Sequence, residues 1–147
     1  MELNNHICRA KRIDNGEWVQ GYYLKHNTVK TCFSTDDQKP KHYIIYEGFC
    51  DWGLMPPLLM AEVDPDTVCR YTGRTDKNGK WIFEGDIFVY SDEYSYVVKW
   101  DSKQIGFCAE CVNETYDYDF LNNFYKFLCE VIGNIFDNPK LMEVNND

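Results

Sequence analysis

YTGRTDKNGKWIFEGD, residues 71–86, is the stretch of this chain that decides its fold. At its centre, Asp76-Lys77-Asn78-Gly79 is typical of a hairpin turn, because Asn and Gly adopt positive φ at low cost and so close two twisted strands. An apolar strand over residues 80–84 follows, Gly85 interrupts it, and residues 87–90 begin the next strand. Short strands joined by tight turns indicate a small β-barrel or roll.

More strands are expected on either side of this stretch, each bounded by turn-forming residues. In residues 94–100, Tyr96, Val98 and Trp100 share one face while Lys99 lies on the other, as in a strand with one buried side. After them, Phe120, Phe124, Phe127 and Leu128 recur at helical spacing, which predicts a short helix near 118–129. The other strands expected in this half are 67–74, 106–112 and 131–136.

The first half of the chain predicts a hairpin followed by loops. Asp14-Asn15-Gly16 reads as the turn between strands 7–13 and 17–25. Residues 31–41 are polar and predict a loop, and 42–49 predict another strand. The prolines within residues 51–65 predict irregular structure, because proline gives a strand no N–H donor. We therefore expect an α+β, mainly β chain.

These elements divide into an N-terminal β-hairpin and loop segment, residues 1–64, and a small barrel with its short helix, residues 65–147. A length of 147 residues suits one domain, or a compact domain with a substantial extra segment. Aromatic residues make up 16% of the chain and supply large side chains for a β-rich core.

The chain is acidic, with a net charge of −9 and a pI near 4.7. A nucleic-acid-binding protein normally carries a basic face, because neutralising phosphates supplies most of its affinity. The densest basic region, residues 9–12, is short. The composition disfavours duplex binding and leaves open a basic partner or a single-strand contact through aromatic side chains.

Cysteine usage and hydropathy bear on the compartment. The opening MELNNHICRA has no continuous apolar run of the signal-peptide kind, and the longest apolar patch, residues 53–61, is too short to span a bilayer. We expect a cytoplasmic protein without membrane contact, whose reduced thiols act mostly as small core residues. The cysteines are Cys8, Cys32, Cys50, Cys69, Cys108, Cys111 and Cys129.

Cys108-Ala109-Glu110-Cys111 is the one CxxC pattern and therefore the candidate zinc half-site. A second pair with matching spacing is lacking, and thiols three apart on a strand point to opposite faces unless a bulge intervenes. We expect no metal or cofactor, although a metal site at Cys108 and Cys111 stays open. Completing ligands would have to come from Cys50, Cys69, Cys129, His26 or His42.

Catalytic groups are not evident in the sequence. His6, His26 and His42 fall in the terminus or the loop-rich first half, and none adjoins a recognised nucleophile motif. A spatial Cys–His pair would make a small thiol-dependent enzyme, an alternative that the sequence leaves open.

Two surface hypotheses accompany the fold. An acidic cluster interleaved with tyrosines reads as a solvated loop or as a docking surface for a basic partner. An aromatic set at strand periodicity reads as core, or as a surface that stacks bases or grips a proline-rich peptide. The cluster is Glu110, Glu114, Asp117 and Asp119 with Tyr116 and Tyr118; the aromatic set is Trp81, Phe83, Tyr96, Trp100 and Phe107.

Three segments, taken in order, resemble the YopX family of phage and prophage proteins. They are VCRYTGRTDKNGKWIFEGDIF at 68–88, VVKWD at 97–101 and VIGNIFDNP at 131–139; an opening segment of the kind at 8–24, CRAKRIDNGEWVQGYYL, is also usual there. The similarity covers most of residues 65–141.

The resemblance implies a C-terminal SH3-like barrel with an N-terminal β segment packed against it, a tendency to form homo-oligomers, and location in the cytoplasm of a bacterium carrying a phage or prophage. It implies no biochemical activity, so no catalytic, cofactor-binding or metal-binding residue is carried over. The motif residues have structural explanations: glycines at turns, and Asp86 bonding nearby backbone amides across the bend.

We therefore expect a non-enzymatic accessory protein that acts by binding, as a homo-oligomer or with an unidentified host or phage protein. A single-stranded nucleic-acid-binding module is the main alternative, and a small thiol-dependent enzyme is the second.

Overall fold

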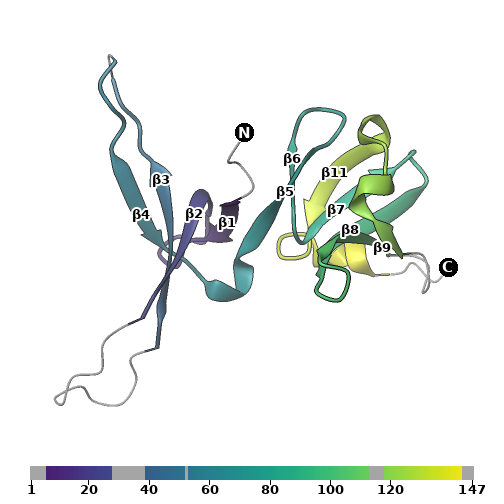
Figure 1. Cartoon of the computed structure of the whole chain (residues 1–147), viewed down its shortest axis with the longest axis horizontal. Helices are drawn as coiled ribbons and strands as arrows, with labels where there is room; N and C mark the ends of the chain where they lie inside the picture. Colours follow the sequence, from purple (N-terminus) through teal and green to yellow (C-terminus); the bar gives the residue numbers. More distant parts are fainter. Residues whose placement is uncertain (1–5, 28–38, 52, 113–117, 144–147) are drawn as a thin grey trace. The chain divides into compact units, whose positions relative to one another are not determined.

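The computed structural model describes residues 6–27, 39–51, 53–112 and 118–143. These residues are mainly β, as the sequence predicts, and form two antiparallel sheets with short 3-10 turns (Figure 1). The strands are β1 (Ile7–Lys11), β2 (Trp18–His26), β3 (Lys41–Glu47), β4 (Leu58–Glu62), β5 (Cys69–Thr75), β6 (Trp81–Phe83), β7 (Asp86–Tyr90), β8 (Tyr94–Asp101), β9 (Gly106–Cys111), β10 (Tyr118–Phe120) and β11 (Cys129–Asn134). The 3-10 turns are η2 (Pro65–Thr67), η3 (Leu121–Asn123), η4 (Lys126–Leu128) and η5 (Pro139–Met142).

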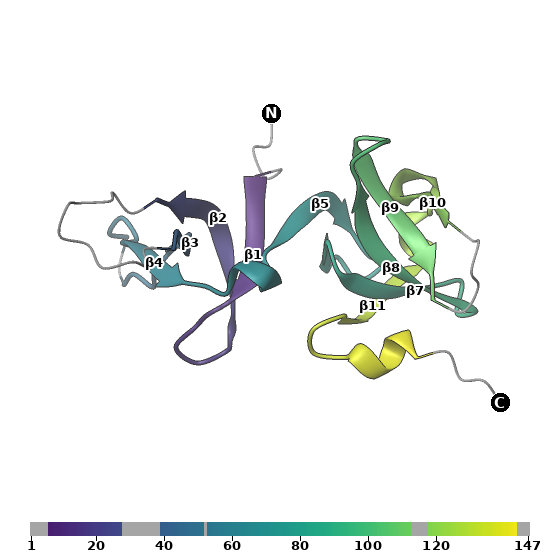
Figure 2. The same ribbon diagram turned by 90° about the horizontal axis from the view of Figure 1, so that it is seen from below.

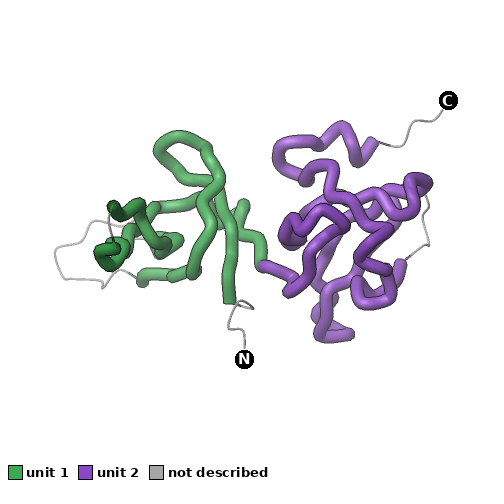
Figure 3. The backbone as a smooth tube through the Cα atoms, turned by 90° about the horizontal axis from the view of Figure 1, so that it is seen from above, with its two compact units in different colours: residues 1–70 green, residues 71–147 purple. Residues whose placement is uncertain are grey.

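The chain divides into two compact units, residues 1–70 and residues 71–147, coloured green and purple in Figure 3. Each unit has its own hydrophobic core of buried side chains. The first core consists of Cys8, Ala10, Val19, Ile44, Ala61 and Val63. The second consists of Ile82, Phe88, Tyr96, Val98, Ala109, Cys111, Leu121, Phe124, Cys129 and Val131.

The first unit is built on the predicted hairpin. β1 and β2 pair antiparallel, and Gly16 in the connecting turn takes the positive φ of 72° that a side chain would disfavour. β3 pairs with β2, and β4 pairs with β3 as the edge of the sheet. At Gly21 the backbones come so close that an added Cβ would lie 2.1 Å from the Ile45 carbonyl oxygen.

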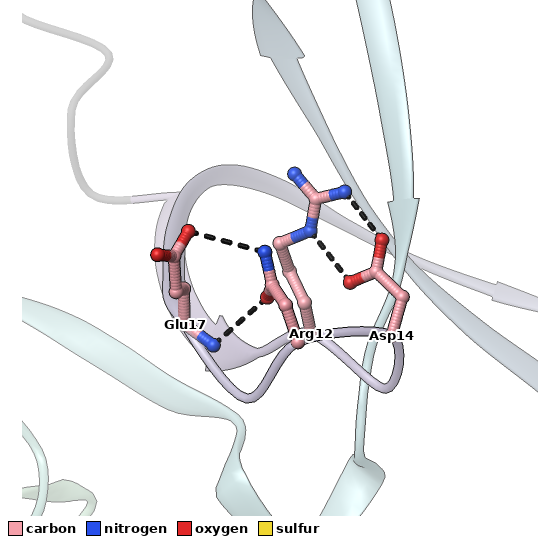
Figure 4. Close-up of polar contacts among 4 residues, drawn as sticks. Arg12, Asp14 and Glu17 are labelled. Atoms are coloured by element: carbon pink, nitrogen blue, oxygen red, sulfur yellow. Dashed lines mark hydrogen bonds and ion pairs between the residues drawn. The ribbon is translucent and has the colours of Figure 1, made fainter.

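Polar contacts hold the turn of this hairpin (Figure 4). The Arg12 guanidinium donates to Asp14 through two hydrogen bonds, Nε to Oδ1 at 2.9 Å and Nη2 to Oδ2 at 2.6 Å. This pairing lowers the pKa of Asp14 and raises that of Arg12. The Glu17 amide donates to the side-chain oxygen of Asn15, two residues before it, at 2.9 Å, and this hydrogen bond forms an Asx-type turn.

The expectation of irregular structure throughout residues 51–65 is wrong, because β4 occupies Leu58–Glu62 and pairs with β3. The prolines lie outside the ladder: Pro56 and Pro57 precede the strand and Pro65 begins η2. Proline therefore limits the ends of this strand without removing one of its donors. The expected loop at 31–41 lies mostly outside the described residues.

The second unit contains a five-stranded antiparallel sheet in the order β10-β9-β8-β7-β11, with β10 beside β9 in Figure 2. Ladder pairing ends at β10 and at β11, so among the described residues this sheet is open. The SH3-like barrel expected from the sequence is therefore not confirmed.

The helix expected near 118–129 is wrong. That segment forms β10 and the 3-10 turns η3 and η4, separated by extended residues such as Phe124, at φ −83° and ψ 128°. Its carbonyls are satisfied from elsewhere: the Arg74 side chain donates to the carbonyl oxygens of Leu121 and, at 2.6 Å, Phe124. Aromatic residues favour extended backbone, so the helical spacing misled.

β5 takes part in two ladders. Cys69 and Arg70 pair with β1 of the first unit, whereas Tyr71 and Thr75 pair with β6. The motif that begins at Tyr71 thus continues the strand whose first residues pair with β1, and β6 is the last strand of the six-stranded sheet β4-β3-β2-β1-β5-β6.

Candidate functional site

Asp76, the first residue of the motif turn, is a structural carboxylate that is only 1% exposed. Its Oδ1 accepts hydrogen bonds from the amides of Asn78 and Lys80, each at 2.9 Å. Its Oδ2 accepts from the Val131 amide at 3.0 Å, which ties the turn to β11. Gly79 supplies the positive φ of 79° that closes the turn. These contacts occupy the carboxylate with backbone donors.

Asp86 has a similar role at the glycine bend. It is 1% exposed, and its Oδ2 accepts from the Phe83 amide at 2.8 Å. Gly85 in the bend has φ of 80°. The prediction that Asp86 bonds backbone amides across the bend is confirmed. The link from Asp76 to Val131 was missed, since a contact across 55 positions leaves no local sequence signal.

Cys108 and Cys111 both lie in β9 and are both buried, but they are not brought into a metal site. Cys111 belongs to the second core, whereas the Cys108 thiol donates to the Lys99 carbonyl oxygen at 3.4 Å. Within the described ranges, no group of three or more His, Cys, Asp or Glu side chains is placed to hold a metal ion. Cys32 lies outside those ranges.

Of the other described groups, the Cys129 and Cys50 thiols and His42 each have a hydrogen-bond partner other than a thiol–histidine pair. Burial raises the pKa of the Cys129 thiol, which donates to the Tyr125 carbonyl oxygen at 3.3 Å. Cys50 is half-buried and donates to the Leu54 carbonyl oxygen at 3.2 Å. Tyr23, rather than a thiol, is the partner of His42: its hydroxyl lies 2.5 Å from Nδ1 and the rings stack.

The remaining described cysteines and histidines lie on other elements. Cys8 and Cys69 are buried in the first unit. His6 is exposed ahead of β1, and His26 is the exposed last residue of β2.

The acidic cluster is only partly described, because Glu114, Tyr116 and Asp117 fall outside the described residues. Glu110 forms an ion pair with Lys99 across β8 and β9. The Tyr118 hydroxyl donates to Asp101 Oδ2 at 2.5 Å, which lowers the pKa of Asp101 and raises that of Tyr118. Asp119 lies on β10 and is half-buried.

The aromatic set is mainly packing. Phe83 and Tyr96 are buried, and Trp81 stacks on Tyr71 with ring centroids 4.4 Å apart. Trp100 is half-buried and meets Phe107 edge to face at 5.0 Å. Ring-to-ring contacts therefore account for most of this set, which favours its interpretation as core.

A different surface was not anticipated: an exposed apolar face on the first sheet. Tyr22, Ile45 and Met60 lie opposite one another on three successive strands. Tyr22 is 54% exposed and Met60 is 60% exposed. Alternation along the strands places Leu24 and Leu58 on the same side. We call these five residues the β2–β4 apolar face. The sequence signal for this face was the spacing of two residues between Tyr22 and Leu24 and between Leu58 and Met60.

The described residues also line pockets, of which two contain polar side chains beside apolar ones. One, of about 260 Å³ in the first unit, is lined by Lys39, Lys41, His42 and Glu62 with apolar neighbours. Lys41 and Glu62 already pair across it at 3.4 Å. The other, of about 210 Å³, lies in the second unit.

The part of the chain that the structure describes holds no helix of the length and apolar character needed to cross a membrane. No curated protein matches the chain. The family model described as YopX protein matches residues 8–143, nearly the whole length. This chain therefore belongs to the YopX family.

Proposed function

We propose that this chain is a non-enzymatic accessory protein of a phage or prophage that works in the bacterial cytoplasm by binding. We propose further that it self-associates through the β2–β4 apolar face. The observation that carries the proposal is the row of Tyr22, Ile45 and Met60 on neighbouring strands. Contiguous exposed apolar surface on a soluble domain marks interaction sites.

The position of this face supports self-association. Among the described strands β4 is the edge of the sheet, so the proposal has its outer backbone groups pair with another strand. A second copy that presents the same edge would extend both the ladder and the apolar face, as a twofold interface requires.

We infer that the second unit is an open variant of an SH3-like barrel. Its short strands are joined by tight turns, and β11 carries a register shift between Val131 and Gly133. Irregularities of this kind bend strands at barrel corners.

Light scattering coupled to size-exclusion chromatography tests the proposal, with Met60→Ser as the main variant. We expect the wild type to have a multimeric mass and Met60→Ser to shift it toward that of a single 17.4 kDa chain. Met55→Ser is the matched control, because Met55 is 91% exposed but lies outside the strands. A monomeric wild type at micromolar concentration, or equal effects of the two variants, would refute self-association through this face.

A single-stranded nucleic-acid-binding module is the second candidate, favoured by the surroundings of Trp18. Arg9 Cζ lies 4.8 Å and Lys11 Nζ 5.5 Å from its ring centroid, which combines an aromatic platform with two cations. Filter binding of a single-stranded oligonucleotide decides the matter: salt-sensitive retention that Trp18→Leu abolishes supports this candidate, and absence of retention at low salt removes it.

A further inference from the structure

The pocket of about 210 Å³ in the second unit has aromatic walls and polar groups at its rim. Tyr90, Tyr96 and Phe124 form the walls, and Asp119 and Asn123 supply the polar groups. Pockets that hold drug-sized ligands start near about 300 Å³, so this one suits a single side chain or a similarly small group.

The walls are held rigidly by ring contacts. Phe124 meets Tyr90 edge to face at 5.1 Å and Tyr96 at 4.9 Å between centroids. Phe88 stacks on Tyr96 at 5.6 Å from within the core. Aromatic faces carry a negative quadrupole, so the half-buried Tyr90 ring favours a cation that lies against it.

The rim offers acceptors. Asp119 Oδ1 accepts from the Phe120 amide at 2.7 Å and from Asn123 Nδ2 at 2.6 Å, which fixes the carboxylate. Asp119 Oδ2, Asn123 Oδ1 and the Tyr90 hydroxyl receive no hydrogen bond from the residues that the structure describes. Three acceptors beside aromatic faces are suited to a ligand that is cationic and rich in N–H donors.

Charge points the same way. Residues 71–147 contain 14 Asp and Glu against 7 Lys and Arg, a net of −7. This surplus attracts cations to the second unit and disfavours anions. Among cations, a guanidinium combines a planar face that stacks on aromatic rings with a fork of donors that matches a carboxylate, whereas an ammonium is a compact, strongly hydrated charge.

We propose that this pocket binds the guanidinium group of an arginine side chain presented by a basic segment of a partner protein. The guanidinium lies against the half-buried Tyr90 ring and donates to Asp119 Oδ2 and Asn123 Oδ1. The site is separate from the β2–β4 apolar face and does not depend on self-association.

The test uses the full chain and small blocked amino acids followed by ¹H–¹⁵N NMR. Acetyl-arginine amide is the probe, and acetyl-citrulline amide is the comparator, because citrulline keeps the shape and removes the charge. We expect saturable shifts at the Asn123 side-chain amide and the Phe124 backbone amide with the arginine probe, and shifts at least tenfold weaker with citrulline. Equal responses to the two probes, or shifts confined to other residues, would overturn the proposal.

Variants locate the interaction. Asp119→Asn preserves the shape of the rim and is expected to weaken arginine binding at least tenfold, while Asp92→Asn, in an exposed turn of the same unit, leaves it unchanged. Tyr90→Leu removes the aromatic face against which the guanidinium lies, so it is expected to weaken binding about threefold to tenfold even if Asp119→Asn alters the local fold. Unchanged binding in both test variants would contradict the assignment.

The source of the guanidinium is decided by a second comparison. A blocked Gly-Arg-Gly peptide is expected to bind at least as tightly as free arginine, because both carry a net charge of +1 and the peptide presents the side chain as a protein segment does. Binding of free arginine that is tenfold tighter than that of the peptide would overturn the role of a partner segment.

Discussion

At the scale of single residues, two buried carboxylates in the motif at 71–86 hold its turn and bend by accepting hydrogen bonds from backbone amides. Asp76 accepts three amide hydrogen bonds from a position that is 1% exposed, and Asp86 accepts at least one in the same state of burial. Such groups are costly to leave unpaired, so their demand for partners defines the turn and the bend uniquely. The hydrogen-bonding capacity of Asp76 and Asp86 therefore serves to hold the fold.

Asp76→Asn is expected to lower the free energy of unfolding by about 2–4 kcal/mol, because it removes a charge and turns one acceptor toward amide donors as an NH₂ group. Urea unfolding followed by tryptophan fluorescence measures this. Asp92→Asn is the control, since Asp92 is exposed and Asn tolerates its positive φ of 58°. Equal stability of the two variants would contradict the role of Asp76 in stabilising the turn.

The Tyr118–Asp101 contact predicts a pH effect. Because the hydrogen bond from Tyr118 lowers the pKa of Asp101 from its ordinary value of 3.8, its contribution is fully present above about pH 3.8 and is lost as the pH falls through the lowered folded value. Tyr118→Phe is expected to return the pKa of Asp101 toward 3.8, measured by carboxyl NMR titration. An unchanged titration would show that another group holds the carboxylate.

At the scale of elements, two strands of the first sheet approach closely at Gly21. A Cβ there would lie 2.1 Å from a backbone oxygen of β3, so β2 and β3 must separate to admit it. Gly21→Ala is expected to cost about 1–3 kcal/mol of stability by overpacking, measured by thermal or urea unfolding.

Gly106→Ala is the matched control for this prediction. Its added Cβ meets ordinary van der Waals distances, 3.5 Å from the Phe120 ring, so it is expected to be neutral or stabilising. A neutral Gly21→Ala would mean that the two strands part easily.

Prediction of the elements from sequence succeeded where local chemistry decides and failed where distant partners decide. The hairpin around Gly16 and the turn at Gly79 were predictable, because positive φ selects glycine. The segment after Tyr118 was not, because its extended backbone is held by Arg74 from more than forty positions away. The strand at Leu58–Glu62 was obscured by flanking prolines, and the aromatic-walled pocket joins residues from three separate stretches.

At the scale of the whole molecule, each unit has its own core, and this predicts separable unfolding. Gly21→Ala is expected to accelerate amide hydrogen exchange in β2 and β3 by a larger factor than in β7 and β8, as read by mass spectrometry. A uniform acceleration across both units would show instead that the chain unfolds as one cooperative block.

The strand that serves two ladders has a consequence for inheritance. Cys69 and Arg70 pair with β1 of the first unit while Tyr71 and Thr75 pair with β6 of the second, within seven consecutive residues. Recombination with foreign DNA inside this interval would produce a protein whose β5 combines halves from two different parents, so that one of its two pairings would be mismatched. The coding regions of the two units are therefore expected to be inherited together, with tolerated recombination points lying outside them.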